Sequence, residues 1–154
     1  MADRLLIRTD GASRSNPGPA SAGAVLIDAT RPDATSIDAP PLSVVSRPLG
    51  VQTNNVAEYT ALVLALKEAQ RLGAREIDLR LDSKLIVEQL HGRWRVKDPK
   101  MRVLWGEARD LLAGFEAWNA THEPRATNKA ADALANLALD DPAAAARLEA
   151  KYRG

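Results

Sequence analysis

The chain has 154 residues, of which 45% are hydrophobic and 27% charged, a composition typical of one soluble globular domain. Cysteine is absent and only two histidines occur, which excludes disulfide scaffolds, thiolate metal sites, cysteine nucleophiles and histidine-only zinc sites. Any metal must therefore be held mainly by oxygen ligands, which favours Mg²⁺, Mn²⁺ or Ca²⁺. The net charge of +1 provides no global field that would favour nucleic acid.

The longest run of large apolar residues, Ala61–Leu66, is far too short to span a membrane. Met1–Arg4 leads directly into a strand-like run and lacks the features of a signal peptide. We therefore expect a cytoplasmic monomer without a membrane partner. Charge is nevertheless uneven along the chain, because five basic residues lie between His91 and Arg102 against a single acid, Asp98.

Residues 5–49 predict three consecutive strands that form an antiparallel meander. The predicted strands are Leu5–Thr9, which leads into Asp10, then Ala20–Asp28 and Leu42–Leu49. The stretch between the first two strands, residues 11–19, is rich in Gly, Ser, Asn and Pro and predicts a loop. Residues 29–41 carry three prolines and predict a hairpin tip.

Apolar residues recur at helical spacing from Thr53 onward, which predicts a helix that Gly73 ends. Apolar and charged residues alternate over Ile77–Leu81, which predicts a fourth strand. The next predicted elements are two helices, a strand and a helix, at Ser83–His91, Pro99–Ala113, Phe115–Thr121 and Thr127–Leu139, the last with Thr127 as its N-cap. The order β-β-β-α-β-α-α-β-α indicates a mixed α/β fold. We expect residues 1–139 to form the domain and residues 140–154 a tail that is a short helix or frayed.

Four carboxylates lie at or near the ends of these predicted elements. Asp10 ends the first strand, Asp82 follows the fourth, and Glu58 and Asp132 lie early in two of the helices. If the first and fourth strands are adjacent and parallel, Asp10 and Asp82 emerge at the same edge of the sheet. Converging carboxylates repel one another unless cations neutralise them. Two Mg²⁺ ions do so in sites that carry out in-line displacement at phosphorus.

Each acid also has an ordinary structural interpretation. Asp10 and Asp82 fit turn or helix-capping positions, Glu58 fits a capping box with Asn55, and Asp132 lies on a polar line of its helix. For any one acid, this interpretation is the simpler one. Taken together, the residues alone leave the metal site and the structural interpretation about equally open.

The residues around these acids form four motifs. They are TDGASRSNPGP from Thr9, TNNVAEY from Thr53, LDS from Leu81, and HEPR from His122 followed by NKAADALA from Asn128. In this order, and over nearly the whole chain, they resemble the type 1 ribonuclease H family. The resemblance implies a five-stranded mixed sheet with helices packed around it. It also implies hydrolysis of the RNA strand of an RNA/DNA hybrid, leaving a 5′-phosphate and a 3′-hydroxyl.

The resemblance further implies a role for each site residue. Asp10, Glu58, Asp82 and Asp132 would bind two Mg²⁺ ions, or Mn²⁺, with Asp10 bridging them. His122 would assist proton transfer or product release; its structural interpretation is a polar strand-end residue in a satisfied hydrogen bond. The expected contacts to the hybrid are Gly11, Ser13, Asn16, Thr53, Asn54 and Asn55. The asparagines have a structural interpretation too, as turn and helix-capping residues.

The chain departs from many bacterial members in lacking a long basic insertion, because only Gly92–Pro99 spans that position. Trp94, Arg95 and Lys97, beside Arg93, would replace the insertion as a small basic and aromatic surface for the DNA strand. The other interpretation is a solvated loop with Trp94 tucked inward. The short form also resembles ribonuclease H domains fused to phosphatase-like partners, so the chain could be one module of a longer protein.

Two other functions are compatible with the motifs. One is a nuclease of the same fold that acts on double-stranded RNA. The other is a catalytically silent module that binds hybrids, against which the complete set of four acids argues. A protein that only binds gains nothing from clustering like charges.

Overall fold

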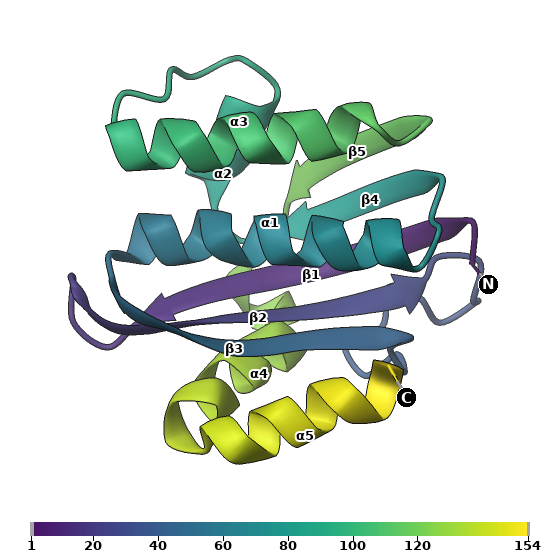
Figure 1. The fold of residues 1–154 in the computed structure, drawn as a ribbon. Helices are drawn as coiled ribbons and strands as arrows, with labels where there is room; N and C mark the ends of the chain where they lie inside the picture. The colour runs from purple at the N-terminus through teal and green to yellow at the C-terminus, as the bar shows by residue number, and fades with distance from the viewer. Residues whose placement is uncertain (1, 154) are drawn as a thin grey trace.

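A computed structural model describes residues 2–153 and contains a five-stranded mixed sheet with helices on both faces (Figure 1). The strand order is β3-β2-β1-β4-β5. The strands are β1 (Arg4–Ser13), β2 (Gly18–Asp28), β3 (Ser43–Gln52), β4 (Glu76–Leu81) and β5 (Ala117–His122). The first three strands pair antiparallel, while β4 pairs parallel with both β1 and β5. The predicted mixed α/β fold is confirmed.

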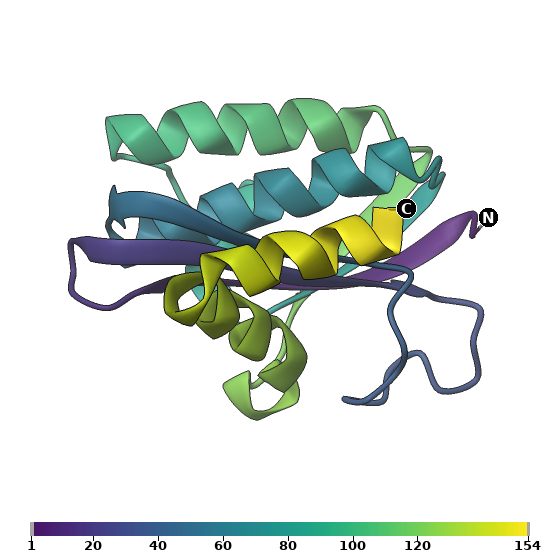
Figure 2. The same cartoon turned by 60° about the horizontal axis from the view of Figure 1, so that its bottom comes forward.

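Helices cover the two faces of the sheet unequally (Figure 2). They are α1 (Asn54–Arg71), α2 (Lys84–Leu90), α3 (Pro99–Ala113), α4 (Lys129–Asp140) and α5 (Pro142–Arg153), with a 3-10 turn at Arg125–Thr127. The first three pack on one face, and α4 and α5 pack on the other, over β1, β2 and β3. None of the helices in residues 2–153 has the length and apolarity needed to cross a membrane.

The central strand β1 is buried on both faces. Its alternating side chains divide between two cores, with Leu5 and Ile7 packed beneath α1 and Leu6 packed on the α4 side. Because both faces are covered, the residues at the end of this strand are held by packing from two directions. Asp10 is one of them, and only 5% of its surface is exposed.

Helix α4 crosses the sheet directly over Gly23, which pairs with Asp10 on the neighbouring strand. A Cβ atom at Gly23 would lie 2.1 Å from the carbonyl oxygen of Ala131, so any larger residue would push the helix away. This close approach brings the first turn of α4, with Asp132, next to the end of β1. No motif in the sequence marks Gly23.

The first strand is longer than predicted. It continues through Asp10 to Ser13, so the predicted loop over residues 11–19 shortens to residues 14–17. Residues 11–13 belong to the sheet because they pair with residues 20–22 of β2. Local turn propensity is overridden here by cross-strand pairing.

The start of α4 also differs from the prediction. Thr127 is not the N-cap, because it lies in the 3-10 turn, where its hydroxyl donates to the carbonyl of Pro124 at 2.8 Å. The N-cap is Asn128, one residue later, and its side chain makes no capping hydrogen bond.

The C-terminal tail is a helix and not a frayed segment. Helix α5 packs on β3 and buries Ala145 and Glu149. The Glu149 carboxylate accepts a hydrogen bond of 2.7 Å from the backbone N–H of Ser46, on the edge strand β3. The helix therefore satisfies an edge-strand donor that would otherwise be open to pairing with another chain.

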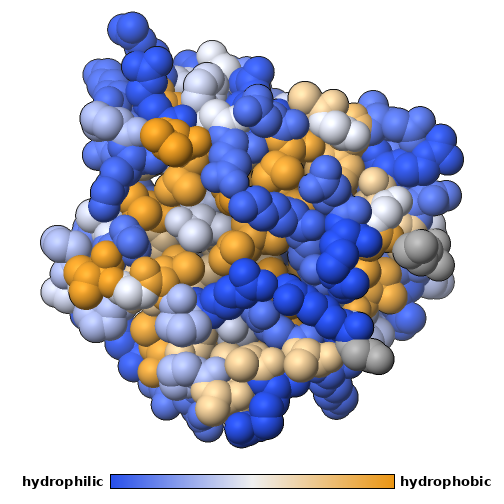
Figure 3. Space-filling model, in the orientation of Figure 1, coloured by the Kyte–Doolittle hydropathy of each residue, from blue (hydrophilic) through white to orange (hydrophobic). Residues whose placement is uncertain are grey.

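Exposed large apolar side chains are scattered over the described surface. They are Ile37, Leu42, Val51, Trp94 and Val103. On the face drawn in Figure 3, apolar side chains show mainly in the middle, with hydrophilic side chains around them. Single exposed apolar residues are ordinary on soluble proteins and do not by themselves mark a docking surface.

Candidate active site

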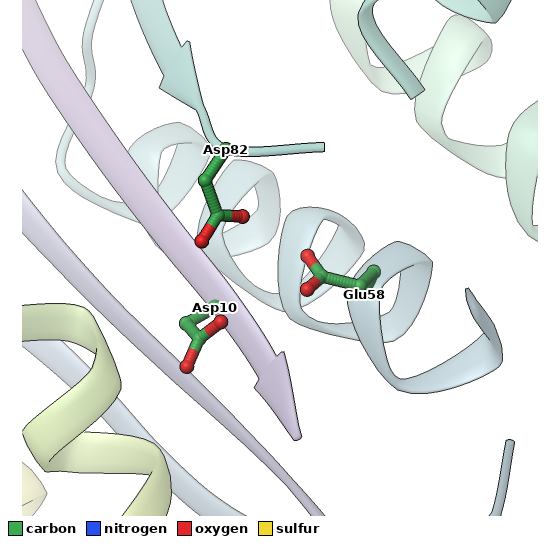
Figure 4. Close-up of side chains that lie close together, drawn as sticks. All are labelled: Asp10, Glu58 and Asp82. Carbon is green, nitrogen blue, oxygen red and sulfur yellow. The ribbon is translucent and has the colours of Figure 1, made fainter. Parts of the chain in front are cut away.

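Three carboxylates meet at the edge of the sheet where β1 and β4 emerge (Figure 4). Asp10 lies in β1, Asp82 follows the last residue of β4, and Glu58 projects from the second turn of α1. One oxygen of each lies within 4.8 Å of the other two. The register explains the first pair, because Thr9 is level with Leu81 in the parallel ladder and the next residues of both strands therefore lie side by side.

The position of Glu58 depends on how α1 begins. The hydroxyl of Thr53 caps the helix by accepting from the N–H of Val56 at 3.2 Å, so neither Asn54 nor Asn55 is the cap. The second turn then packs on Gly11, where a Cβ atom would lie only 2.2 Å from the backbone nitrogen of Glu58. Glycine is required at this point for the helix to approach the strand.

Asp132 lies beside Asp10 but outside the group of three. Asp132 is close enough to contribute to the raised pKa of Asp10, and Asn136 donates to Asp132 at 3.4 Å. The Asp132 side chain is 41% exposed, and a guanidinium nitrogen of Arg125 lies 4.0 Å from it. The structure thus brings four acids to one edge, with the fourth on the solvent side.

Burial raises the pKa of Glu58 to about 9 and that of Asp10 to about 8. The negative charge of Asp82 is the second contribution to both increases, and the Arg125 guanidinium only partly offsets them. Carboxylates that are crowded and partly buried are stabilised when they bind either protons or cations, because both neutralise the negative charge. An all-oxygen donor set with this electrostatic demand fits hard divalent cations such as Mg²⁺ or Mn²⁺.

We expect the metal-free protein to lose stability as the pH rises. The folded pKa values of Asp10 and Glu58 lie above their ordinary values of 3.8 and 4.5, so the folded state binds more protons than the unfolded state from about pH 4 to about pH 9. The free energy of unfolding should therefore fall across this window, and Mg²⁺ should restore it more at pH 8 than at pH 5. Urea unfolding with EDTA or Mg²⁺ at several pH values measures this. A flat EDTA profile would contradict it.

His122 lies at the same edge as the acids. It is the last residue of β5 and is level with Leu81, one residue before Asp82. Its side chain is exposed and makes no hydrogen bond within residues 2–153. The structural interpretation, a strand-end residue in a satisfied hydrogen bond, therefore has no support in the described part of the chain.

Four of the six predicted polar contacts line the cleft of the acids, and the other two, Asn16 and Thr53, lie beside it at the start of α1. Asn16 accepts from the N–H of Asn54 at 3.1 Å, and Asn54 accepts from the N–H of Ser13 at 3.0 Å. These bonds join the β1–β2 loop to the start of α1 and leave both amide NH₂ groups for other partners. With Gly11 and Asn55, Asn54 and Ser13 border an open cleft of about 430 Å³ that also contains the three acids.

The basic loop forms a separate groove of about 510 Å³, lined by Trp94, Arg95 and Lys97 among others. Trp94 is not tucked inward, because 46% of its surface is exposed. Arg93 is paired with Glu88, which makes it a weaker candidate for contacting a phosphate. The carbonyl of Arg95 accepts from the Gln89 side chain at 3.0 Å, so the loop is anchored to α2.

Arg125 and Asn128 stand inside the fourth motif, but the sequence alone indicates no role for either of them. Arg125 is 83% exposed and borders the cleft of the acids. Asn128 is 3% exposed, and its Nδ2 donates to the carbonyl of Thr9 at 2.7 Å. A cation or an amide inside an acidic motif is a sequence signal for such residues, although it does not distinguish their roles.

A mixed sheet in the order β3-β2-β1-β4-β5, with carboxylates gathered where β1 and β4 emerge, defines a protein of the ribonuclease H-like class. Residues 8–138 match the family model described as reverse transcriptase-like. Ribonuclease HI of Halobacterium salinarum is 49% identical over 132 residues, 86% of this chain. The crystal structure of RNase H1 from that organism has a TM-score of 0.81 and 47% identity, covering 90% of this chain and 98% of that one. The chain belongs to the type 1 ribonuclease H family.

Two further relatives extend the comparison. The bifunctional protein Rv2228c of Mycobacterium tuberculosis is 43% identical over 96% of this chain. LC11-RNase H1, whose crystal structure was solved in complex with an RNA/DNA hybrid, has a TM-score of 0.79 and 35% identity, covering 90% of this chain and 98% of that one. The chain spans 62% of the Halobacterium protein and 38% of Rv2228c.

Proposed function

We propose that the protein is a ribonuclease H, a metal-dependent endonuclease that hydrolyses the RNA strand of RNA/DNA hybrids and leaves a 5′-phosphate and a 3′-hydroxyl. The observation that carries this proposal is the group of Asp10, Glu58 and Asp82, whose carboxylate oxygens lie within 4.8 Å of one another. The group lies at the end of β1, a strand that is buried on both faces. The hybrid-bound structure of LC11-RNase H1, a relative at 35% identity, supports the choice of substrate.

Asp10, Glu58, Asp82 and Asp132 are the residues that would hold two Mg²⁺ ions, or Mn²⁺. Asp10 would contribute to holding both ions, because its carboxylate neighbours Asp82 on one side and Asp132 on the other. When bound, the ions supply charge neutralisation at the phosphate and lower the pKa of the attacking water. Because the acids come from β1, α1, β4 and α4, the folded scaffold fixes their spacing before any substrate binds.

Recognition of the hybrid is assigned to the polar border of the cleft. Asn16, Asn54 and Asn55 offer amide donors and acceptors without adding charge near the acids, which suits the 2′-hydroxyls displayed in a wide minor groove. Thr53 caps the start of α1, and Asn16 in the β1–β2 loop accepts from the first N–H of that helix; a helix N-terminus favours a phosphate nearby. Gly11 and Ser13 shape the β1 side of the same cleft.

Cleavage of matched RNA/DNA, RNA/RNA and DNA/DNA duplexes, with Mg²⁺ or with EDTA, tests the proposal. We expect cuts only in the RNA strand of the hybrid, only with the metal, and with 5′-phosphate ends. Preferred cleavage of RNA/RNA would favour the double-stranded RNA nuclease. Hybrid binding without any cleavage would favour the silent binding module.

Replacing His122 with Ala should slow turnover by roughly 10–10³-fold without abolishing it, the range of an auxiliary acid–base group. The side chain lies at the edge that carries the acids and is free of internal hydrogen bonds within residues 2–153. Single- and multiple-turnover rates on a hybrid measure the effect. Asn119→Ala, at an exposed position of the same strand, is the control. Unchanged rates in both regimes would return His122 to a structural role.

Replacing Arg95 and Lys97 together with Ala should flatten the salt dependence of hybrid affinity. Each neutralised phosphate contributes about 0.9 to the slope of log affinity against log salt for a B-form duplex, so the change should be up to about two units. KM should rise far more than kcat falls, because the groove is separate from the cleft of the acids.

Binding measured in Ca²⁺ at several salt concentrations gives this slope without efficient turnover. The matched control is Arg147→Ala with Lys151→Ala, which removes two cations of α5 on the other face of the sheet that form no ion pair within residues 2–153. If the groove variant and the control have the same slope as the unaltered protein, the basic loop is only a solvated segment.

For the chain as a whole, we propose that residues 1–139 form the nuclease domain and that the remaining helix supports β3. A cytoplasmic monomer is the proposed state, supported by the absence of cysteine and the scattered exposed apolar residues. Since the chain covers only part of two of its relatives, a role as one module of a longer protein fits the same observations.

A further inference from the structure

Three buried side chains hold α4 to the sheet. Asn128 lies at the start of the helix, Ser21 lies in β2, and Ser46 lies in β3. In each case the side chain donates to a backbone carbonyl across the interface. The bonds are Asn128 Nδ2 to Thr9 O at 2.7 Å, Ser21 Oγ to Ala135 O at 2.6 Å, and Ser46 Oγ to Leu134 O at 2.6 Å. The first of them borders the acids, and the two serine bonds lie more than one turn further along the helix.

Asn128 uses its side chain in an unusual way for an N-cap residue. An N-cap asparagine ordinarily accepts from a backbone N–H of its own first turn. Here no such bond forms, and the side chain reaches β1 instead. Its own carbonyl accepts from the N–H of Asp132 at 3.1 Å. Asn128 therefore links Thr9, the residue before Asp10, to the backbone of Asp132.

Stability alone does not account for this arrangement. Asn128 is 3% exposed, and its Oδ1 has no hydrogen-bond partner within residues 2–153. An unsatisfied buried acceptor is destabilising, and it calls for a specific explanation where it persists. A serine at this position could cap α4 without leaving such an acceptor.

Asp132 needs support from its backbone, because its side chain is weakly held. It is 41% exposed, its bond from Asn136 is long at 3.4 Å, and the Arg125 contact is 4.0 Å. We infer that Asn128 is a positioning residue that fixes the separation of Asp10 and Asp132, and so the geometry of the metal ligands on the α4 side. This inference rests on the proposed function.

The decisive variant is Asn128→Ser, which offers a helix cap but is too short to reach Thr9 as the asparagine does. Asn128→Ala removes both the reach and the cap. We expect either change to lower kcat by roughly 10–100-fold, the range found for residues that orient metal ligands. KM for the hybrid should stay within about twofold, because the substrate contacts lie elsewhere. Mn²⁺ affinity, measured by calorimetry without substrate, should weaken by roughly tenfold at one of the two sites.

Ser46→Ala is the matched control, because it removes a comparable bond between α4 and the sheet away from the acids. It should lower the urea midpoint and leave kcat and Mn²⁺ affinity within about twofold of the unaltered protein. Normal kcat and Mn²⁺ affinity in Asn128→Ser would overturn the inference, as would an equal loss in Ser46→Ala. If the unaltered protein fails to cleave any hybrid, the proposed function is wrong, and the calorimetric comparison still decides the role of Asn128.

Discussion

Replacing Asp10 or Asp82 with Asn should abolish hybrid cleavage, with a loss of turnover of more than about 10³-fold, the scale of losing a central catalytic group. Each substitution removes one oxygen ligand and one negative charge from a group of three carboxylates within 4.8 Å. The same substitutions should raise the stability of the metal-free protein by on the order of 1–2 kcal/mol, because they relieve repulsion between partly buried acids. Turnover on a hybrid and urea unfolding in EDTA measure the two effects.

Asp110→Asn provides a charge-matched control, since Asp110 is exposed on α3 and distant in sequence from the four motifs. It should change neither turnover nor stability beyond about 0.5 kcal/mol. A fall in turnover together with a rise in stability distinguishes a metal-ligand role from general damage to the fold, which would lower both. Near-normal turnover in both Asp10→Asn and Asp82→Asn would contradict the assignment of two metal ions to this site.

Replacing Gly11 with Ala should reduce turnover by roughly 100-fold or more, since small displacements of reacting groups have effects of this size. The new Cβ atom would lie 2.2 Å from the backbone nitrogen of Glu58 and from the carbonyl carbon of Ala57. Both are backbone atoms, so the second turn of α1 must move and carry the Glu58 carboxylate away from Asp10. The overpacking should also destabilise the fold by about 1–3 kcal/mol.

Gly106→Ala is the control for this substitution. Gly106 lies inside α3, and a Cβ atom there would meet nothing within 4 Å. That variant should be more stable by about 0.4–1 kcal/mol, because alanine favours a helix interior, and should keep normal turnover. A Gly11→Ala protein with normal kcat would show that α1 can adjust without displacing Glu58.

Much of the fold and part of the site follow from local patterns in the sequence. The alternation over Ile77–Leu81 and the helical spacing after Thr53 identify elements that the structure contains, because burial of one face imposes those periods. Gly73 ends the first helix region with a φ of 78°, a conformation that favours glycine. The four acidic motifs, in order along the chain, identify the family before any contact is known.

The tertiary structure alone decided how those elements meet. The extension of β1 to Ser13 depends on pairing with β2, and the meeting of Asp10 with Asp82 depends on the parallel register of β1 and β4. Local sequence encodes neither, since partner strands are far apart along the chain. The raised pKa of Glu58 likewise arises from burial against distant residues.

The same reason explains why Asn128 and Gly23 escaped notice in the sequence. An asparagine before a helix looks like a cap, and a glycine in a strand looks like a weak point. In the folded protein, Asn128 donates to the carbonyl before Asp10, and Gly23 lets α4 lie on the sheet. The sequence by itself determined which residues carry the chemistry. The distances between those residues were decided by long-range packing, because backbone atoms of α1 and α4 come to rest on glycines of β1 and β2.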